Sequence, residues 1–83
     1  MNVDASEKLS LGLRLQQARL EKKYSLNYVA EKLHLSKQQV ESLERDDYSY
    51  VSALAYARGH LRLYAKLVDL PVTEVLKDFD ALG

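Results

Sequence analysis

The fold is decided by residues 24–45, which read YSLNYVAEKLHLSKQQVESLER. Apolar residues recur at helical spacing on both sides of a break at Ser36. Ser36 and Gln39 have the form of a capping box, in which each side chain bonds the other residue's backbone N–H at the start of a helix. The stretch therefore predicts two short amphipathic helices, over 26–33 and 37–45, joined by a tight turn as a helix-turn-helix.

The apolar spacing outside this stretch predicts three further helices, near residues 10–23, 52–68 and 73–79. The first nine residues, 1–9, are mostly polar, and we expect them to be flexible. We find no internal repeat, no linker and no pattern typical of a strand. Residues 10–83 are therefore expected to form one all-α domain of five helices.

The composition excludes several classes of function. The chain has 83 residues, no cysteine and two histidines, so thiolate metal sites are excluded. It has no Gly-rich phosphate loop, no nucleophile elbow and no histidine pair at metal spacing. We therefore expect no enzyme activity, no cofactor and no metal. Twelve basic and twelve acidic residues give zero net charge, which disfavours a stand-alone nucleic-acid binder.

The helix predicted near 10–23 carries two apolar stripes. They comprise Leu11, Leu15 and Ala18 on one face, and Leu9, Leu13 and Leu20 on another. We expect the helix to bury both stripes, as a terminal helix does when neighbours pack on two of its sides. The alternative is that the second stripe contacts a partner.

The helix predicted near 52–68 carries three rows of side chains. These are Ala57, Leu61, Tyr64 and Val68; Tyr56, His60, Leu63 and Leu67; and Arg58, Arg62 and Lys66. The first row is expected in the core. Tyr56, His60 and Leu63 suit a protein interface, because aromatic groups with a polar tip bury a large area; the alternative is that the helix buries this row too. Arg58 and Arg62 suit acidic groups at the rim. Gly59, inside the helix, indicates a close backbone approach.

The helix-turn-helix also supports a second hypothesis, a repressor-type DNA-binding regulator. In that geometry the second helix of the motif enters the major groove. The side chains able to reach bases would be Lys37, Gln38, Gln39 and Ser42. The acidic residues of the same region, expected to oppose phosphates, are Glu41, Glu44, Asp46 and Asp47. Because Asp46 and Asp47 are adjacent, we interpret them as a solvated turn and not as a catalytic pair.

Two stretches resemble known families. Residues 24–45 resemble the helix-turn-helix of the Cro/C1 repressor superfamily. Residues 56–76, YARGHLRLYAKLVDLPVTEVL, are similar to a narrower group, the cytoplasmic domain of RodZ, a family of bacterial cell-shape proteins. The opening GxxLxxAR pattern of that group is also present, in Gly12, Leu15, Ala18 and Arg19. The resemblance covers residues 12–76.

The resemblance implies a domain on the cytoplasmic side of the inner membrane, with a basic linker, a transmembrane helix and a periplasmic domain beyond residue 83. It implies binding of the actin-like filament protein MreB through fourth-helix aromatics, which match Tyr56 and His60; the family favours Phe or Tyr where His60 stands. Recruitment of other cell-division or wall-synthesis proteins is a further possibility. Asp46 replaces a usual Gly, and Leu26 replaces the Gln that DNA-binding repressors commonly carry.

Overall fold

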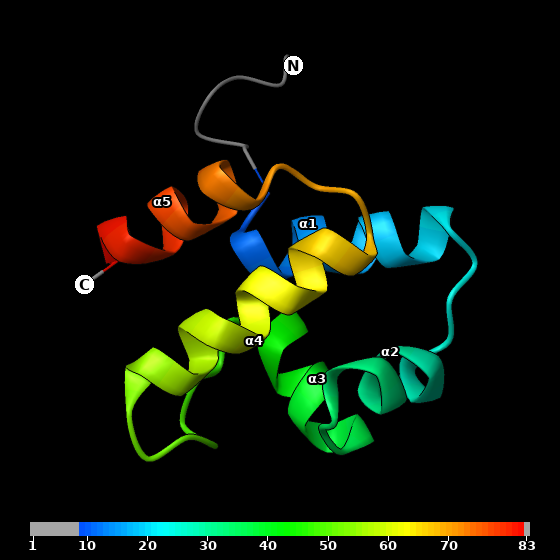
Figure 1. The fold of residues 1–83 in the computed structure, drawn as a ribbon, viewed down its shortest axis with the longest axis horizontal. Coiled ribbons are helices and arrows are strands. Elements are labelled where there is room, and N and C mark those ends of the chain that lie inside the picture. The colour runs from blue at the N-terminus through cyan, green and yellow to red at the C-terminus, as the bar shows by residue number, and fades with distance from the viewer. Residues whose placement is uncertain (1–8, 83) are drawn as a thin grey trace, which may run out of the picture.

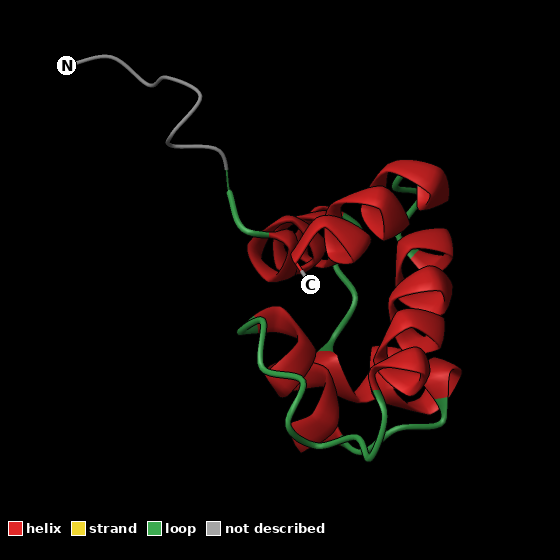
Figure 2. Ribbon diagram, turned by 90° about the vertical axis from the view of Figure 1, so that its left-hand side faces the viewer, coloured by secondary structure: helices red, strands yellow, loops and turns green. Residues whose placement is uncertain are grey.

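A computed structural model describes residues 9–82, and these form five α-helices joined by short connections (Figure 1). The helices are α1 (Leu11–Glu21), α2 (Leu26–Leu33), α3 (Lys37–Glu44), α4 (Leu54–Leu67) and α5 (Val72–Leu82). In the described part of the chain Figure 2 shows helices and loops but no strand. The predicted fold class, all-α with five helices, is confirmed. The expectation of flexibility for residues 1–8 lies outside the described residues.

The turn between α2 and α3 is built from the residues that the sequence singles out. The Ser36 hydroxyl accepts a hydrogen bond from the Gln39 N–H (3.1 Å), and the Gln39 side-chain oxygen accepts one from the Ser36 N–H (2.9 Å). These two bonds confirm the capping box. The preceding helix ends at His34, whose backbone turns through a left-handed conformation with φ 59°. The helix-turn-helix therefore has defined caps on both sides of its turn.

Each of the first four helices is followed, one or two residues after its end, by a left-handed residue that is not glycine. They are Lys23, His34, Asp46 and Asp69, with φ between 59° and 63°. The change of backbone direction at Lys23 explains why α1 ends at Glu21 and not near residue 23. The one-residue difference at the end of α3, which stops at Glu44, has the same origin because Asp46 follows it closely.

The start of α4 and the end of α5 also differ from the predicted bounds. α4 begins at Leu54, two residues later than expected, because Ala53 is extended (φ −147°, ψ 141°) and has no side chain that could cap the helix. α5 continues to Leu82, three residues past the predicted end at Phe79. Its last turns are tied to α4, since the Arg58 Nε donates to Asp80 Oδ1 at 2.9 Å.

The core forms where one stripe of α1 meets the buried faces of α2, α3, α4 and α5. Leu15 is fully buried with Leu43 and Leu61, and Phe79 closes the core from α5. The second α1 stripe, expected to be buried, is exposed, which makes that prediction wrong. Leu9, Leu13 and Leu20 are all exposed, and Leu20 shows 56 % of its surface. The two stripes lie on opposite sides of α1, and the described helices cover only the first.

The close backbone approach occurs at Gly12, not at Gly59 as the sequence suggested. A Cβ at Gly12 would lie 2.4 Å from the Glu44 carbonyl oxygen and 2.6 Å from that of Leu43, at the end of α3. The Gly12 N–H donates to Asp46 Oδ1 at 2.8 Å. Asp46 is therefore a half-buried cap for α1 and not a solvated turn residue. A Cβ at Gly59 would meet nothing within 4 Å, so that prediction is wrong.

A buried polar network connects three helices in the core. Glu44 of α3 is 5 % exposed, and Arg19 of α1 is 7 % exposed. The Arg19 Nε donates to Glu44 Oε2 at 2.8 Å, and its Nη1 donates to the Tyr24 carbonyl oxygen at 3.0 Å. The Tyr64 hydroxyl of α4 donates to the same Glu44 oxygen. Burial and the Glu44 carboxylate hold the pKa of Tyr64 above its usual range.

The two glycines provide a matched test of packing. Gly59→Ala is expected to stabilise the domain by about 0.5–1 kcal/mol, because alanine is the better helix former and the added methyl meets no atom. Gly12→Ala is expected to destabilise it by about 1–3 kcal/mol, because the methyl would press on the α3 backbone. Urea unfolding measures both. Equal effects of the two substitutions would contradict the close contact at Gly12.

The buried network predicts unequal costs for its members. Tyr64→Phe is expected to lower the free energy of unfolding by about 1.5–3 kcal/mol, because it removes a hydrogen bond to a buried charge. Glu44→Gln is expected to cost about 3–5 kcal/mol, because it leaves the Arg19 guanidinium buried without its counter-charge. Tyr56→Phe, on the surface, is the control and should change little. If Tyr64→Phe costs no more than this control, the network contributes nothing to stability.

Candidate functional site: the exposed face of α4

α4 divides its side chains between the core and the surface. Its core row, Ala57, Leu61, Tyr64 and Val68, is buried as predicted. In the second row Tyr56 is 60 % exposed and Leu63 is 46 % exposed, while His60 and Leu67 are half-buried. The alternative that α4 buries this whole row is therefore wrong. Tyr56, His60 and Leu63 lie at spacings of four and three residues, so they share one side of the helix.

His60 is held in place by a residue from the loop before α4. The Tyr50 hydroxyl lies 2.8 Å from His60 Nδ1, and the two rings stack with centroids 5.8 Å apart. Burial lowers the pKa of His60 and raises that of Tyr50 to about 12. A neutral imidazole can therefore accept a hydrogen bond from the Tyr50 hydroxyl at Nδ1. The sequence analysis missed Tyr50. The sequence shows that the loop before α4 contains tyrosines, but no local pattern indicates that one of them contacts His60 of α4.

The two arginines proposed for the rim have different surroundings. Arg58 makes a two-pronged ion pair with Asp80 of α5, with Nε–Oδ1 at 2.9 Å and Nη2–Oδ2 at 3.0 Å. This pairing raises the pKa of Arg58 and lowers that of Asp80. Arg62 is exposed, and within residues 9–82 no carboxylate forms an ion pair with it. Arg62 is thus the better placed of the two for an acidic partner.

The surface of α3 matches the DNA-binding hypothesis only in part. Lys37 and Gln38 are exposed, whereas the Gln39 side-chain oxygen is engaged in the capping box. The Ser42 hydroxyl accepts a bond from Arg45 at 3.3 Å. Glu44, expected to face phosphates, points into the core instead.

The acidic charge of this region is smaller than the sequence suggested. Because Glu44 pairs with Arg19 and Asp46 caps α1, Glu41 and Asp47 are the acidic residues left at the α3 surface. The Asp47 carboxylate accepts bonds from the Ser49 hydroxyl and N–H, which lower its pKa. The negative field expected to repel DNA is therefore reduced.

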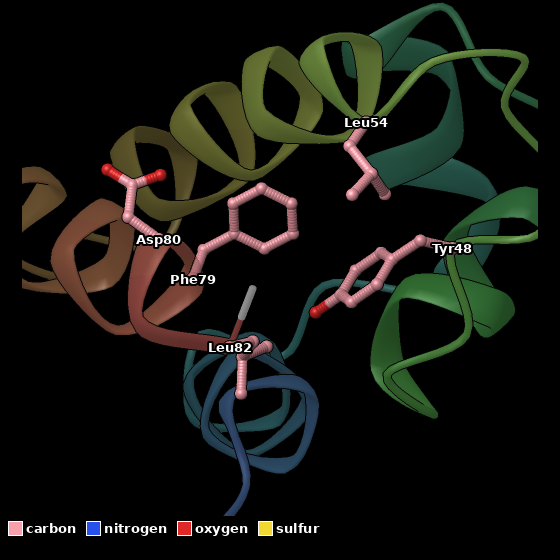
Figure 3. A pocket seen from close by; sticks show the side chains of 5 residues that line it. All are labelled: Tyr48, Leu54, Phe79, Asp80 and Leu82. Carbon is pink, nitrogen blue, oxygen red and sulfur yellow. The ribbon is translucent and has the colours of Figure 1, made fainter.

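A pocket lies between α5, the loop after α3 and the first residue of α4. Its lining is mainly apolar and comprises Tyr48, Leu54, Phe79, Asp80 and Leu82 (Figure 3). Tyr48 meets Phe79 edge to face at 5.1 Å between ring centroids. Burial raises the pKa of Tyr48 to about 12, and its hydroxyl has no hydrogen-bond partner among the described residues. The pocket contains no grouping of side chains typical of catalysis.

Two negative findings apply to residues 9–82. No group of three or more acidic or histidine side chains there is arranged to hold a metal ion. None of the helices in that range is both long and apolar enough to cross a bilayer.

The environment of His60 predicts a pH dependence. Histidine in an unfolded chain titrates near pH 6.5, and burial gives folded His60 a lower pKa. Between the two pKa values the unfolded chain binds the proton and the folded chain does not. The free energy of unfolding is therefore expected to fall as the pH drops below about 6.5, by at most about 1.4 kcal/mol per pH unit.

Urea titrations of the wild type and of His60→Phe between about pH 7.5 and pH 5.5 measure this effect. In the variant, the free energy of unfolding should fall less steeply with decreasing pH, because His60 no longer contributes. Asp47 and Asp80, with lowered pKa values, titrate in a more acidic range. Identical slopes in the two proteins would contradict the buried, neutral state of His60.

Comparison with known proteins agrees with this architecture. A family model described as a helix-turn-helix domain matches residues 14–75, which include the whole of α2, α3 and α4. No solved structure matches the chain. The matching family is found in RodZ-like proteins, and such domains are typically non-enzymatic binding modules. Because the match covers most of the sequence, the chain belongs to the helix-turn-helix domain family.

Proposed function

We propose that this domain is the cytosolic part of a RodZ-like membrane protein and acts as an adaptor for the actin-like filament protein MreB. In this role the domain performs no catalysis. It would work on the cytoplasmic side of the inner membrane, with a membrane anchor beyond residue 83. Recruitment of other cell-division or wall-synthesis proteins would be a secondary role of the same surface.

The observation that carries the proposal is the exposed row on α4. Tyr56 and Leu63 expose 60 % and 46 % of their surface to solvent although both have large, mainly apolar side chains. The core row on the other side of the helix and the Tyr50–His60 contact hold this row in position. A tyrosine has few rotamers, so it loses little conformational entropy when a partner covers it, which is typical of an interface anchor.

A DNA-binding regulator is the second candidate, favoured by one observation. Lys37 and Gln38 are exposed at the start of α3, and Glu44 is buried in the core and adds no negative charge to this surface. Against it, Gln39 is engaged in its cap, and Glu41 and Asp47 offset the nearby cations. Phosphate neutralisation dominates DNA affinity, so a surface without a basic excess is a poor match.

Tyr56→Ala is expected to weaken binding to purified MreB filaments by roughly 5- to 150-fold, which corresponds to about 1–3 kcal/mol for an interface anchor. Cosedimentation with the filaments measures the change. Leu82→Ala is the control, because Leu82 is similarly exposed (66 %) but lies on α5, outside both the α4 row and the exposed α1 stripe. If Tyr56→Ala keeps a native circular dichroism spectrum and binds as the wild type does, the assigned interface is wrong.

A gel shift with random duplex DNA at low ionic strength separates the two candidates. The adaptor proposal expects no shift at protein concentrations that saturate the filaments. A shift that Lys37→Glu abolishes and that weakens steeply with salt would support the regulator instead.

A further inference from the structure

A shallow groove runs between α2 and the second half of α4. It is lined by Lys32 and Leu33 from α2 and by Leu63, Lys66 and Leu67 from α4. Three leucines of graded exposure form its floor, since Leu33 is buried, Leu67 is half-buried and Leu63 is exposed. Two lysines stand at its rim. The groove is continuous with the Tyr56 row, because Leu63 belongs to both.

The cations around this groove lack acidic partners within the domain. Among residues 9–82, no carboxylate forms an ion pair with Lys32, Lys66 or Arg62, which precedes Lys66 by one helical turn. Lys32 lies over the Tyr28 ring, with its Nζ 5.5 Å from the ring centroid. This cation–π contact involves no carboxylate, so it brings no counter-charge to the edge of the groove.

Elsewhere on the surface some cations are neutralised by carboxylates and others are not. Arg14 pairs with Asp78 at 2.5 Å, Lys22 with Asp69 at 2.6 Å, and Arg58 with Asp80 at 2.9 Å. What distinguishes the groove is that three cations without a described carboxylate partner surround one apolar floor. An apolar floor between cations is complementary to an apolar side chain flanked by carboxylates.

We propose that the groove docks an acidic, amphipathic segment of the partner protein. A leucine- or phenylalanine-sized side chain of that segment covers Leu33, Leu63 and Leu67, and its neighbouring carboxylates meet Lys32 and Lys66, with Arg62 at the edge. This inference rests on the proposed adaptor function and states the chemistry that the adaptor recognises. It extends the docking surface from the Tyr56 row across to α2.

A protein segment fits the groove better than the other polyanions that cations attract. Recognition of an anionic membrane surface generally uses clusters of about four to eight basic residues, more than the groove provides. A nucleic-acid backbone has no side chain that would cover the leucine floor. Only the protein segment uses both the apolar floor and the charged rim.

The test uses two helical peptides of about 12–15 residues, the length at which isolated helices become marginally stable. One carries a leucine row flanked by glutamates, and the other replaces every glutamate with lysine. In a ¹⁵N NMR titration the glutamate peptide should shift amides around Leu33, Leu63 and Leu67, whereas the lysine peptide should not. The double variant Lys32→Glu/Lys66→Glu should bind the glutamate peptide roughly tenfold more weakly or worse, and should gain binding of the lysine peptide.

Lys37→Glu/Lys77→Glu is the matched control, because it makes the same change in net charge on exposed residues outside the groove. This control should bind both peptides as the wild type does. Equal binding of the two peptides by the wild type, or equal losses in the two double variants, would overturn the proposal. Binding to vesicles of pure phosphatidylglycerol is measured as well. If Lys32→Glu/Lys66→Glu weakens vesicle binding but not peptide binding, the proposal is overturned and the groove is assigned to lipid.

Filament binding separates this inference from the proposed function. If Tyr56→Ala weakens MreB binding and Lys32→Glu/Lys66→Glu does not, the groove proposal fails and the adaptor function stands. If the wild type does not bind the filaments while the glutamate peptide still binds the groove, the adaptor function fails and the groove serves another acidic partner. If the wild type and both variants bind the filaments equally, the filament interface lies elsewhere and the groove proposal fails. Weakening by both variants supports the two proposals together.

Discussion

The arrangement of the helices depends on the hydrogen bonds and the ion pair that the buried Glu44 carboxylate makes. It lies in the core on α3 and is met by Arg19 from α1 and by Tyr64 from α4. A carboxylate buried without partners costs several kcal/mol, so the three helices are favoured only in the arrangement that brings these groups together. Because Tyr64 is on the core side of α4, the same contacts determine which side of that helix faces solvent. The position of Tyr56 is thus set from inside the core.

The burial of Glu44 also changes how the helix-turn-helix can be used. Counted along the sequence, the region of α3 is acidic; counted at its surface, Lys37 and Arg45 roughly balance Glu41 and Asp47. The motif is then neither strongly repelled by a polyanion nor strongly attracted to one. Its caps and its contacts with α1 and α4 hold the five helices in their relative positions. Cations without a described carboxylate partner also lie beside the groove of α2 and α4, and there an apolar floor accompanies them.

Local signals predicted most of the fold, and long-range contacts explain the rest. Ser36 and Gln39 identified the turn, because a capping box involves only residues four positions apart or fewer. No local signal shows which glycine faces another helix, and Gly12 does so only because α1 packs on the end of α3. The position of His60 on the α4 surface followed from helical spacing. Its partner Tyr50 did not, because the loop between them has no periodicity.

The four left-handed corners have a consequence for how the sequence can vary. A side chain in this conformation costs roughly 1–2 kcal/mol, which glycine would avoid. Glycine would in turn give the unfolded chain more freedom, at a cost of about 0.4–1 kcal/mol. The first amount is the larger one, so glycine at Lys23, His34 or Asp69 is expected to leave the stability unchanged or to raise it by up to about 1.6 kcal/mol. Asp46 is the exception, because its carboxylate also accepts a hydrogen bond from the first turn of α1. Replacing Asp46 by glycine would remove that bond and lower the stability of the domain.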